Sequence, residues 1–438
     1  MRKTVSLILA VVICFSLFSC AASYGRFTVA EAAPKMNVTY ADYRQDGYEA
    51  FVDKLAAFSA RLTDAVVDRY GDNDDNIVIS PVSVYMALAL AVECTEGETR
   101  DEILSAVGVS YEEVEGFTAY LYAFLNRDFT YENPFGQEKV LAKEEISNSF
   151  WAAKGLSLKD SGVMKLADDY NCDLYRVDFA SGEARRAIGD YIKDKTHGLC
   201  DGDVEFTPET IIALINTFYL KEVWNREGDE LSLTDDVYDF RCSDGEMEKT
   251  RLLMGYYQGG RVYDGEGYSV FYTKTNHGFS IKFILPDEGK SVSEVFTAEN
   301  IYAVASLDDF GGVDDENERM YFTRTFFPEY EADFDDDIRA ALGSLGISAL
   351  FDRSAADFGG ITDMPAYCSG VIHQCELEVS RKGIEGAAVT ILAVDGTAGD
   401  RRDEYERIYS DFIVDRAFGF VITDSYGAVV FSGIVNEI

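Results

Sequence analysis

The sequence predicts one large α+β domain, on the evidence of its organisation, its composition and the two periods of its apolar segments. Length alone, 438 residues, would suggest two or three domains. No segment rich in proline, serine or glycine divides the chain, however, and its seven prolines are scattered. Hydrophobic residues make up 47% and aromatic residues 13%, which is enough for a sizeable core. Some apolar segments have the helical period and others have the composition of strands, so we expect helix and sheet in one domain.

The first residues have the features of an export signal. Arg2 and Lys3 precede an apolar run of about fifteen residues, which is too short for a comfortable membrane span. The run ends in Leu17-Phe-Ser-Cys20, which resembles a bacterial lipobox, a motif whose cysteine becomes the lipidated N-terminus after cleavage. We therefore expect residues 1–20 to be a lipoprotein-type signal peptide, residues 21–45 a flexible tether and residues 46–438 the folded domain. The protein would be extracellular, either anchored to the cell surface through Cys20 or secreted without a lipid.

Two helices are predicted near the start of the domain. Apolar residues recur at helical spacing until Gly71, at Phe51, Leu55, Phe58, Leu62 and Val66. Ser80-Pro81 then supplies an N-cap and a first-turn proline ahead of residues 82–92, which are apolar nearly all round. The second helix should therefore be deeply buried.

Later segments predict two core strands, a third helix and a hairpin. Residues 214–220 and 279–285 have the composition of core strands. The spacing of Phe334, Ile338, Leu342 and Leu345 predicts a helix, with Asp335, Asp336 and Asp337 at the favourable end of its dipole. Residues 418–422 and 428–435 flank Asp424-Ser-Tyr-Gly427, an arrangement typical of a hairpin.

The segment from Glu376 to Val394 is the most informative part of the chain. It begins as a half-buried strand, passes through a group of small residues and continues into residues 391–394, which again have strand composition. From Ile384 onward every second residue is uncharged, whereas the intervening set carries two charges, on Glu385 and Asp395. With a side-chain period of 2, the uncharged set could face a core if this segment were inserted into a sheet as a strand.

The same segment resembles the hinge of the reactive-centre loop in serpins, the serine protease inhibitor family. The residues that match the family's hinge are Gly383, Glu385, Gly386, Ala387, Ala388 and Thr390. Ile384 and Val389 are bulkier than usual, and Arg381 and Lys382 stand where acidic residues are commoner. Bulk in a hinge can slow insertion, which leaves open a non-inhibitory serpin-fold binding protein whose loop is cleaved as a substrate.

Other serpin-like motifs occur in the right order over about residues 46–438. They include Asn76-Ile-Val-Ile-Ser80-Pro81-Val82-Ser83-Val84, residues 214–224, Lys195-Thr196-His197-Gly198, Val371-Ile-His373 and Phe431-Ser-Gly433. Two departures are Tyr191, where the family has a helix tryptophan, and Ala417, where it usually has a proline. The resemblance implies a single serpin-like domain with a large, mostly antiparallel central sheet, smaller sheets, surrounding helices and an exposed reactive-centre loop.

The resemblance also implies a region where the main sheet parts to accept a strand. Carried over one by one, its residues are Ser80, Ser83, Asn216 and His373, with Trp224 near the top of the same sheet. Hydrogen bonds in a polar cluster can be exchanged when the sheet opens. N-capping alone explains Ser80 equally well. A buried histidine hydrogen-bonded to nearby hydroxyls and amides is the alternative for His373, and ordinary core packing is the alternative for Trp224.

The function implied is a suicide trap for a serine protease. The protease cleaves the loop and forms an acyl-enzyme, and the freed segment then inserts as a new strand and distorts the protease in a covalent 1:1 complex. When residues are counted along the loop from Gly383, as in the family, the scissile bond joins Thr397 and Ala398. A small β-branched residue before the bond would suit elastase-like or subtilisin-like proteases. Arg401 and Arg402 lie just beyond and mark an alternative position for the cleaved bond. Cleavage there would leave four more residues of chain between the sheet and the protease.

Composition and chemistry argue against other function classes. The net charge of −39 opposes binding to nucleic acid or to an anionic bilayer, so the predicted membrane contact is through the lipid alone. Only three histidines are present, and an exported enzyme would have little but Ser80 and His373 to support it. The six cysteines from Cys94 to Cys375 match neither a zinc site nor a disulfide framework, so buried thiols are the default interpretation. We therefore expect a monomeric inhibitor rather than an enzyme, with no metal and no cofactor.

Overall fold

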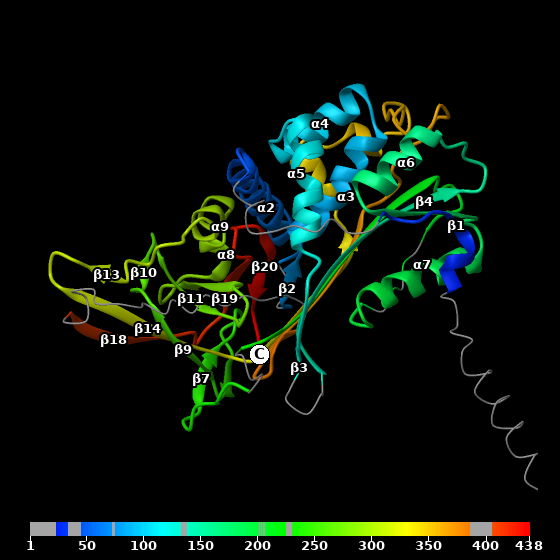
Figure 1. The fold of residues 1–438 in the computed structure, drawn as a ribbon. Helices are drawn as coiled ribbons and strands as arrows, with labels where there is room; N and C mark the ends of the chain where they lie inside the picture. The colour runs from blue at the N-terminus through cyan, green and yellow to red at the C-terminus, as the bar shows by residue number, and fades with distance from the viewer. Residues whose placement is uncertain are drawn as a thin grey trace, which may run out of the picture.

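The computed structural model describes residues 23–33, 45–71, 75–132, 138–200, 202, 204, 206–224, 230–385 and 405–438. Figure 1 shows the described part as a broad sheet with helices packed on it. The predicted signal peptide with Cys20, the loop residues 386–404 and the predicted scissile bond between Thr397 and Ala398 lie outside the described residues.

A large sheet, mostly antiparallel, forms the centre of the described structure and confirms the predicted fold class. Its strand order is β1-β5-β4-β6-β17-β16-β15-β2-β20-β19-β12-β11-β10, with β3 paired to β4, and only β4–β5 and β15–β2 are parallel pairs. The strands are β1 (Thr28–Ala30), β2 (Ile77–Ile79), β3 (Asp128–Glu132), β4 (Glu138–Ala153), β5 (Cys172–Val177), β6 (Ile212–Val223), β10 (Tyr263–Asp264), β11 (Tyr268–Lys274), β12 (Ser280–Pro286), β15 (Tyr330–Asp337), β16 (Ile372–Ser380), β17 (Gly383–Glu385), β19 (Phe418–Thr423) and β20 (Val429–Val435).

Two smaller sheets complete the described strands. The first contains β13 (Val313–Asp314), β14 (Arg319–Phe327), β18 (Glu406–Ile413) and β9 (Leu253–Gly259). The second pairs β7 (Tyr238–Arg241) with β8 (Met247–Thr250). Because β18 resumes directly after the loop, the first of these sheets holds the C-terminal end of that loop.

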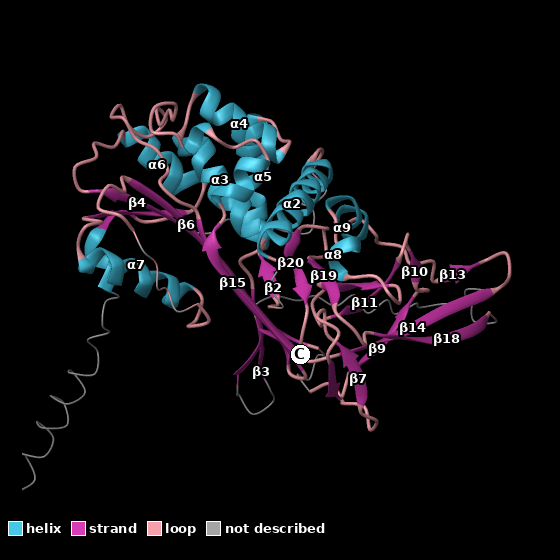
Figure 2. Cartoon of the chain, turned by 180° about the vertical axis from the view of Figure 1, so that it is seen from behind, coloured by secondary structure: helices cyan, strands magenta, loops and turns pink. Residues whose placement is uncertain are grey.

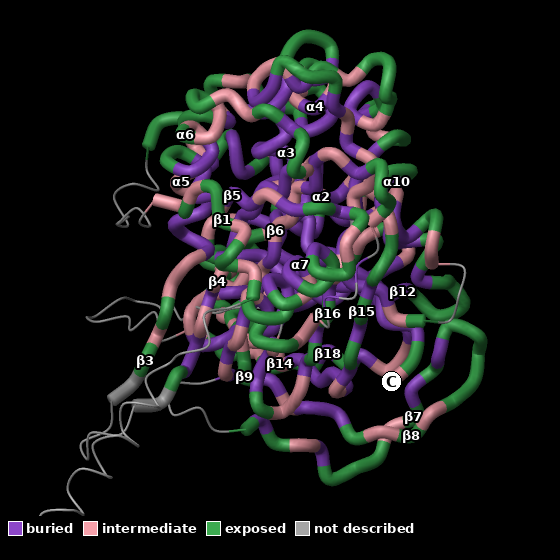
Figure 3. Tube along the Cα trace, turned by 90° about the vertical axis from the view of Figure 1, so that its right-hand side faces the viewer, coloured by how far each residue is buried: buried purple, intermediate pink, exposed green. Residues whose placement is uncertain are grey.

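Helices cover both faces of the part of the sheet that contains β4 and β6. Figure 2 shows α3 to α6 on one side of these strands and α7 on the other. The helices are α2 (Tyr48–Tyr70), α3 (Pro81–Cys94), α4 (Gly97–Val107), α5 (Tyr111–Phe124), α6 (Asp160–Asp169), α7 (Gly182–Lys195), α8 (Val292–Val295), α9 (Ala298–Ala305) and α10 (Arg339–Ser344), with short 3-10 turns η1 (Ser23–Phe27) and η3 (Ala349–Phe351). Figure 3 shows the buried residues running through the middle of these layers.

Several predicted elements are confirmed. Phe51, Phe58 and Leu62 are fully buried on one face of α2. Ser80 caps α3 by accepting the backbone N–H of Ser83, and this helix is buried along almost its whole length. The predicted core strands and the C-terminal hairpin are β6, β12 and the β19–β20 pair. Five of the predicted buried thiols, Cys94, Cys172, Cys242, Cys368 and Cys375, are buried and unbridged.

The helix predicted over Phe334 to Leu345 is wrong in its first part. Residues Tyr330–Asp337 form the strand β15, and a helix begins only at Arg339. Tyr330, Ala332 and Phe334 are buried while Glu331 and Asp333 are exposed, so the segment has the period of a strand as well as a weak helical one. Pairing of all eight residues with β16 decided between the two periods.

The predicted tether over residues 21–45 does not hold for residues 23–33. Residues Ser23–Phe27 form η1, and β1 pairs antiparallel with the edge strand β5. Tyr24 packs edge-on against Tyr175 and Tyr191, at 5.9 and 5.2 Å between ring centroids, and its hydroxyl donates to Asp194 at 2.6 Å. An unpaired sheet edge and an aromatic cluster beside α7 therefore hold a segment that has no hydrophobic period of its own.

Candidate functional site

The short strand β17 lies between β6 and β16 in the centre of the main sheet. It follows β16 after a turn at Arg381 and Lys382 and pairs antiparallel with both neighbours. Gly383 is opposite Val223 of β6, and Glu385 is opposite Glu378 of β16. The start of the predicted hinge is therefore already a strand of this sheet.

Gly383 is required by the close approach of β6. A Cβ atom at this position would lie 1.6 Å from the backbone oxygen of Glu222, and the backbone φ is 153°. Neither the contact nor the conformation suits an L side chain, because a Cβ atom would overlap a neighbouring backbone atom. A glycine here lets the chain turn and enter between two strands.

The alternation predicted from Ile384 onward holds for the residues of the hinge that are described. Ile384 is 1% exposed and points into the core, so its bulk is accommodated within the sheet. Glu385 points to the other face, where Lys221 donates to both carboxylate oxygens at 3.0 Å and the Tyr219 hydroxyl donates at 3.1 Å. Gly386, Ala387, Ala388, Val389 and Thr390 lie outside the described residues.

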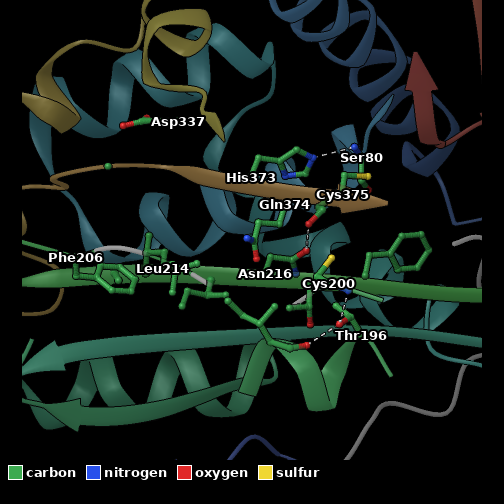
Figure 4. A pocket seen from close by; sticks show the side chains of 18 of the residues that line it. Ser80, Thr196, Cys200, Phe206, Leu214, Asn216, Asp337, His373, Gln374 and Cys375 are labelled. Atoms are coloured by element: carbon green, nitrogen blue, oxygen red, sulfur yellow. Dashed lines mark hydrogen bonds between the residues drawn. The ribbon is translucent and has the colours of Figure 1, made fainter. Parts of the chain in front are cut away.

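A cavity continues the line of β17 between β6 and β16. Its volume is about 210 Å³, and residues of β6, β16 and α7 line it, among them Leu214, Asn216, Gln374 and Ile192. Both strands run antiparallel to β17, so they are parallel to one another. Among the described residues, one isolated parallel bridge, between Ile212 and Cys368, joins β6 to the chain before β16. Figure 4 shows the two strands on either side of the space. The geometry suits one further antiparallel strand.

Four residues predicted to lie where the sheet opens meet at this cavity. The Ser80 backbone N–H donates to His373 Nε2 at 3.0 Å, and the Ser83 hydroxyl donates to Asn216 Oδ1. The Asn216 amide donates in turn to Asn148 Oδ1 at 2.7 Å. In Figure 4, His373 reaches Ser80 from one strand, and Asn216 lies on the strand across the space. The cluster therefore joins α3, β4, β6 and β16 through hydrogen bonds that can be exchanged.

His373 is a neutral hydrogen-bond acceptor. It is 6% exposed, and burial lowers the pKa of its imidazole to about 4. Its Nε2 accepts a backbone N–H, not the Ser80 hydroxyl. This arrangement fits a structural junction and gives no support to a serine nucleophile activated by His373.

Trp224 links the ends of β6 and β16 beside the hinge. Its indole N–H donates to the Ser380 backbone oxygen at 2.7 Å, and its ring packs edge-on against Phe327 at 5.6 Å. The side chain is 3% exposed. Trp224 thus joins the end of β6 to the end of β16, at the same end of the sheet at which β17 enters between them.

Comparisons with known proteins identify this architecture. A family model described as "Serpin (serine protease inhibitor)" matches residues 53–438. The chain belongs to the serpin family. Serpin-ZX of Arabidopsis thaliana is 26% identical to it over 406 residues, covering 86% of this chain and 96% of that protein. Alpha-1-antiproteinase S of Cavia porcellus is 25% identical over 335 residues, covering 73% and 76%.

Solved serpin structures share the fold. The thermophilic serpin tengpin in its native state matches with a TM-score of 0.69 and 23% identity, covering 95% of this serpin and 98% of that chain. Thyroxine-binding globulin in complex with thyroxine matches at 0.67 and 21%, covering 89% and 99%. Membership of the family supports protease inhibition in general, rather than enzymatic activity.

Some residues of the site in this serpin were not predicted from its sequence. Lys221 and Tyr219 hold Glu385, and Asn148 extends the polar cluster to β4. The alternation of β6 could have placed Tyr219 and Lys221 on one face, but nothing in the sequence indicated which strand would lie beside the hinge. Within the described residues, no helix is both long and apolar enough to cross a membrane.

Proposed function

We propose that this serpin inhibits serine proteases by trapping them. The proposal rests on β17, because the first three hinge residues are already paired between β6 and β16 and a cavity extends along the same line. Cleavage of the loop would free residues 386 onward to continue this strand. A protease joined to the cleaved loop as an acyl-enzyme would then be carried along the sheet before it could deacylate.

Insertion is favoured by the groups that a new strand would satisfy. A strand in the cavity would form backbone hydrogen bonds on both sides, since among the described residues β17 separates β6 from β16 only as far as Glu385 and the two strands form no ladder with each other beyond it. Continued alternation would place Ala388, Thr390, Leu392 and Val394 on the core side with Ile384. Each large apolar side chain that becomes fully buried contributes roughly 1.5–3 kcal/mol.

We infer that the scissile bond joins Thr397 and Ala398. A small β-branched residue before the bond suits elastase-like and subtilisin-like proteases. Cleavage near Arg401 or Arg402 would add four residues, roughly 13 Å of extended chain, between the sheet and the protease. That slack would weaken the distortion of the protease, which favours the earlier bond.

Incubation with proteases tests the trap. The chain without its signal peptide is mixed with elastase, subtilisin or trypsin, and the products are separated on denaturing gels. A covalent species at the summed mass is the expected result, and release of cleaved inhibitor alone by every protease would contradict it.

The pair Ala388→Arg and Ala387→Arg tests the insertion face with one chemistry. Arginine at 388 would face the core without a partner and should convert the inhibitor into a substrate, because burying an unpaired charge is expensive. Arginine at 387 would face the opposite side and should retain more of the covalent complex. Equal yields of complex from the two variants would show that the predicted face is misassigned.

A non-inhibitory serpin-fold binding protein is the alternative function. Its sequence support came from the bulky residues Ile384 and Val389. Ile384 is accommodated in the sheet, so this support is reduced to Val389. Cleavage without complex formation in the assay above is the outcome that would favour this alternative.

We further propose that the protein is exported by a bacterium and anchored to the cell surface through Cys20. The basic start, the apolar run and Leu17-Phe-Ser-Cys20 support this assignment. Replacing Cys20 with alanine should abolish lipid labelling. Labelling that persists in this variant would contradict the assignment, and a wild-type chain that is never labelled would favour secretion.

A further inference from the structure

The outer face of the sheet formed by β9, β14 and β18 carries exposed aromatic side chains. Tyr257 and Tyr409 are 44% and 55% exposed, and their rings meet edge to face at 5.1 Å between centroids. Phe322 is paired with Tyr409 across β14 and β18, and the two rings stack at 5.5 Å. Arg324 lies two residues beyond Phe322 and is paired with Tyr257 of β9. We call Tyr257, Phe322, Arg324 and Tyr409 the aromatic face.

Arg324 is held in place at the centre of the aromatic face. Its guanidinium carbon lies 5.0 Å from the ring centroid of Tyr257 and 4.5 Å from that of Phe326. Its Nε atom lies 3.2 Å from Asp411 Oδ1. Side chains that are already ordered by such contacts lose little conformational entropy when a partner binds.

The backbone beside Phe322 leaves room for a partner. Gly259 of β9 is opposite Phe322, and a Cβ atom added to it would have no heavy atom within 4 Å among its described surroundings. The face therefore has projecting rings at Tyr257 and Tyr409 and an open position between β9 and β14.

The charge of these strands differs from that of the whole chain. The three strands β9, β14 and β18 contain three arginines, Arg319, Arg324 and Arg407, against Glu406 and Asp411. The chain as a whole has a formal charge of −39. Tyrosine and arginine are, with tryptophan, the residue types enriched among those that dominate binding energy at protein interfaces, and strands with balanced charge do not repel an anionic partner.

The aromatic face is also continuous with the reactive-centre loop. The described chain resumes at Tyr405 and enters β18 at Glu406, so Tyr409 lies twelve residues after Thr397. Twelve residues span at most about 40 Å. A protease domain of about 230 residues has a radius of gyration of about 17 Å and is therefore roughly 45 Å across. A protease that holds the loop at Thr397 can therefore reach this face. Figure 1 shows these strands on the side of the molecule away from α7.

We propose that the aromatic face is a second docking surface for the protease that attacks the loop, and this inference rests on the proposed inhibitory function. The partner surface would lie beside the protease's active-site cleft and carry apolar side chains with a carboxylate or backbone carbonyls that accept from Arg324. These contacts belong to the encounter complex and are broken when the inserted loop carries the protease away. They accelerate inhibition and select among proteases with the same primary specificity, without changing the fraction of encounters that end in a trap.

The test measures two quantities for each variant: the second-order rate constant of inhibition and the number of inhibitor molecules consumed per protease trapped. The protease is whichever of elastase, subtilisin and trypsin the wild-type chain traps fastest. Tyr409→Ala and Tyr257→Ala each remove a projecting ring, and Gly259→Trp fills the open position. Tyr409→Phe keeps the ring, and Met164→Ala removes a side chain that is 62% exposed on the distant helix α6.

The three face variants should each lower the rate constant about fivefold or more, while the number consumed per protease stays at the wild-type value. Tyr409→Phe and Met164→Ala should stay within about twofold of wild type. Rate constants within twofold in all face variants would overturn the proposal while leaving the trap intact. Dimerisation of the wild-type chain that is lost in Tyr409→Ala, with unchanged rates, would assign the face to a second copy of the chain. A wild-type chain that traps none of the three proteases would refute the proposed function itself, and this surface assignment would fall with it.

Discussion

Gly383 and Ile384 define the hinge at the scale of single residues. Gly383 permits entry into the sheet, since a Cβ atom there would overlap the Glu222 backbone oxygen. Ile384 then occupies a core position. Position 383 therefore requires minimal side-chain volume, whereas position 384 requires apolar bulk. From the sequence, both residues were predicted only as parts of one hinge.

Replacing Gly383 with alanine should therefore displace β17. We expect amide hydrogen exchange at Ile384 and Glu385 to accelerate by an order of magnitude or more, because their pairing with both neighbours depends on the close approach. The number of inhibitor molecules consumed per trapped protease should rise severalfold. Exchange rates equal to those of the wild type would show that the strand tolerates the added atom.

His373 gives the site a defined pH dependence. Its pKa is lowered to about 4 by burial, whereas an unfolded histidine titrates near 6.5. The unfolded state therefore binds more protons between these values, and the contribution of His373 to stability is lost as the pH falls from about 6.5 to about 4. The full shift corresponds to roughly 3 kcal/mol. His277, whose pKa is also lowered to about 4, adds a contribution of the same sign.

His373→Gln should remove that share of the pH dependence while keeping a polar side chain beside Ser80. The measurement is the free energy of unfolding in denaturant at pH 4.5, 5.5 and 7 for both proteins. The difference between them should change by roughly 2 kcal/mol over this range. A constant difference would mean that His373 is not buried in its neutral form.

At the scale of elements, the segment η1–β1 fastens α7 to the edge of the main sheet. The Ala32 backbone N–H donates to Asp173 at 2.9 Å, and Arg26 pairs with Glu183 of α7 at 3.4 Å. Tyr24 joins the aromatic cluster of Trp151, Tyr175 and Tyr191 beneath the helix. The segment thus adds contacts to the helix that covers the cavity.

Tyr24→Ala should loosen this attachment. Loss of two edge-to-face ring contacts and one hydrogen bond to a carboxylate should cost about 1–3 kcal/mol. Hydrogen exchange in α7 and β5 should accelerate, while exchange in β19 and β20 should stay unchanged. Val29→Ala, at a position 39% exposed, serves as the control. Equal protection of α7 in both variants would show that the segment does not hold the helix.

At the scale of the whole molecule, the proposed function requires a fold that gains stability when its loop is cut. Cleavage between Val394 and Arg402 by any convenient protease should add a strand in the cavity between β6 and β16. The added backbone hydrogen bonds and the burial of Leu392 and Val394 should exceed the cost of ordering the segment. Nicking an ordinary loop leaves stability unchanged or lowered.

The cut protein should therefore melt tens of degrees above the intact protein in a calorimetric scan. Cut Ala388→Arg should show a much smaller increase, because its arginine opposes insertion. An equal or lower melting temperature after cleavage of the wild type would support the non-inhibitory alternative.

The sequence by itself determined the elements whose signals are local. Short segments carry the signals for three elements: the apolar spacing of α2, the N-cap Ser80 of α3 and the turn of the β19–β20 hairpin. Because these signals do not depend on distant residues, the sequence placed the elements correctly. Which hinge residues face the core could also be predicted, because side chains alternate between the two faces of any strand. Which strands and side chains would pair with one another could not be predicted. Tertiary structure alone decided that residues 330–337 form a strand, that residues 23–33 pack on α7 and that Glu385 meets Lys221. Each of these depends on pairing between residues far apart in the chain, and that pairing energy overrides the local preference of the segment.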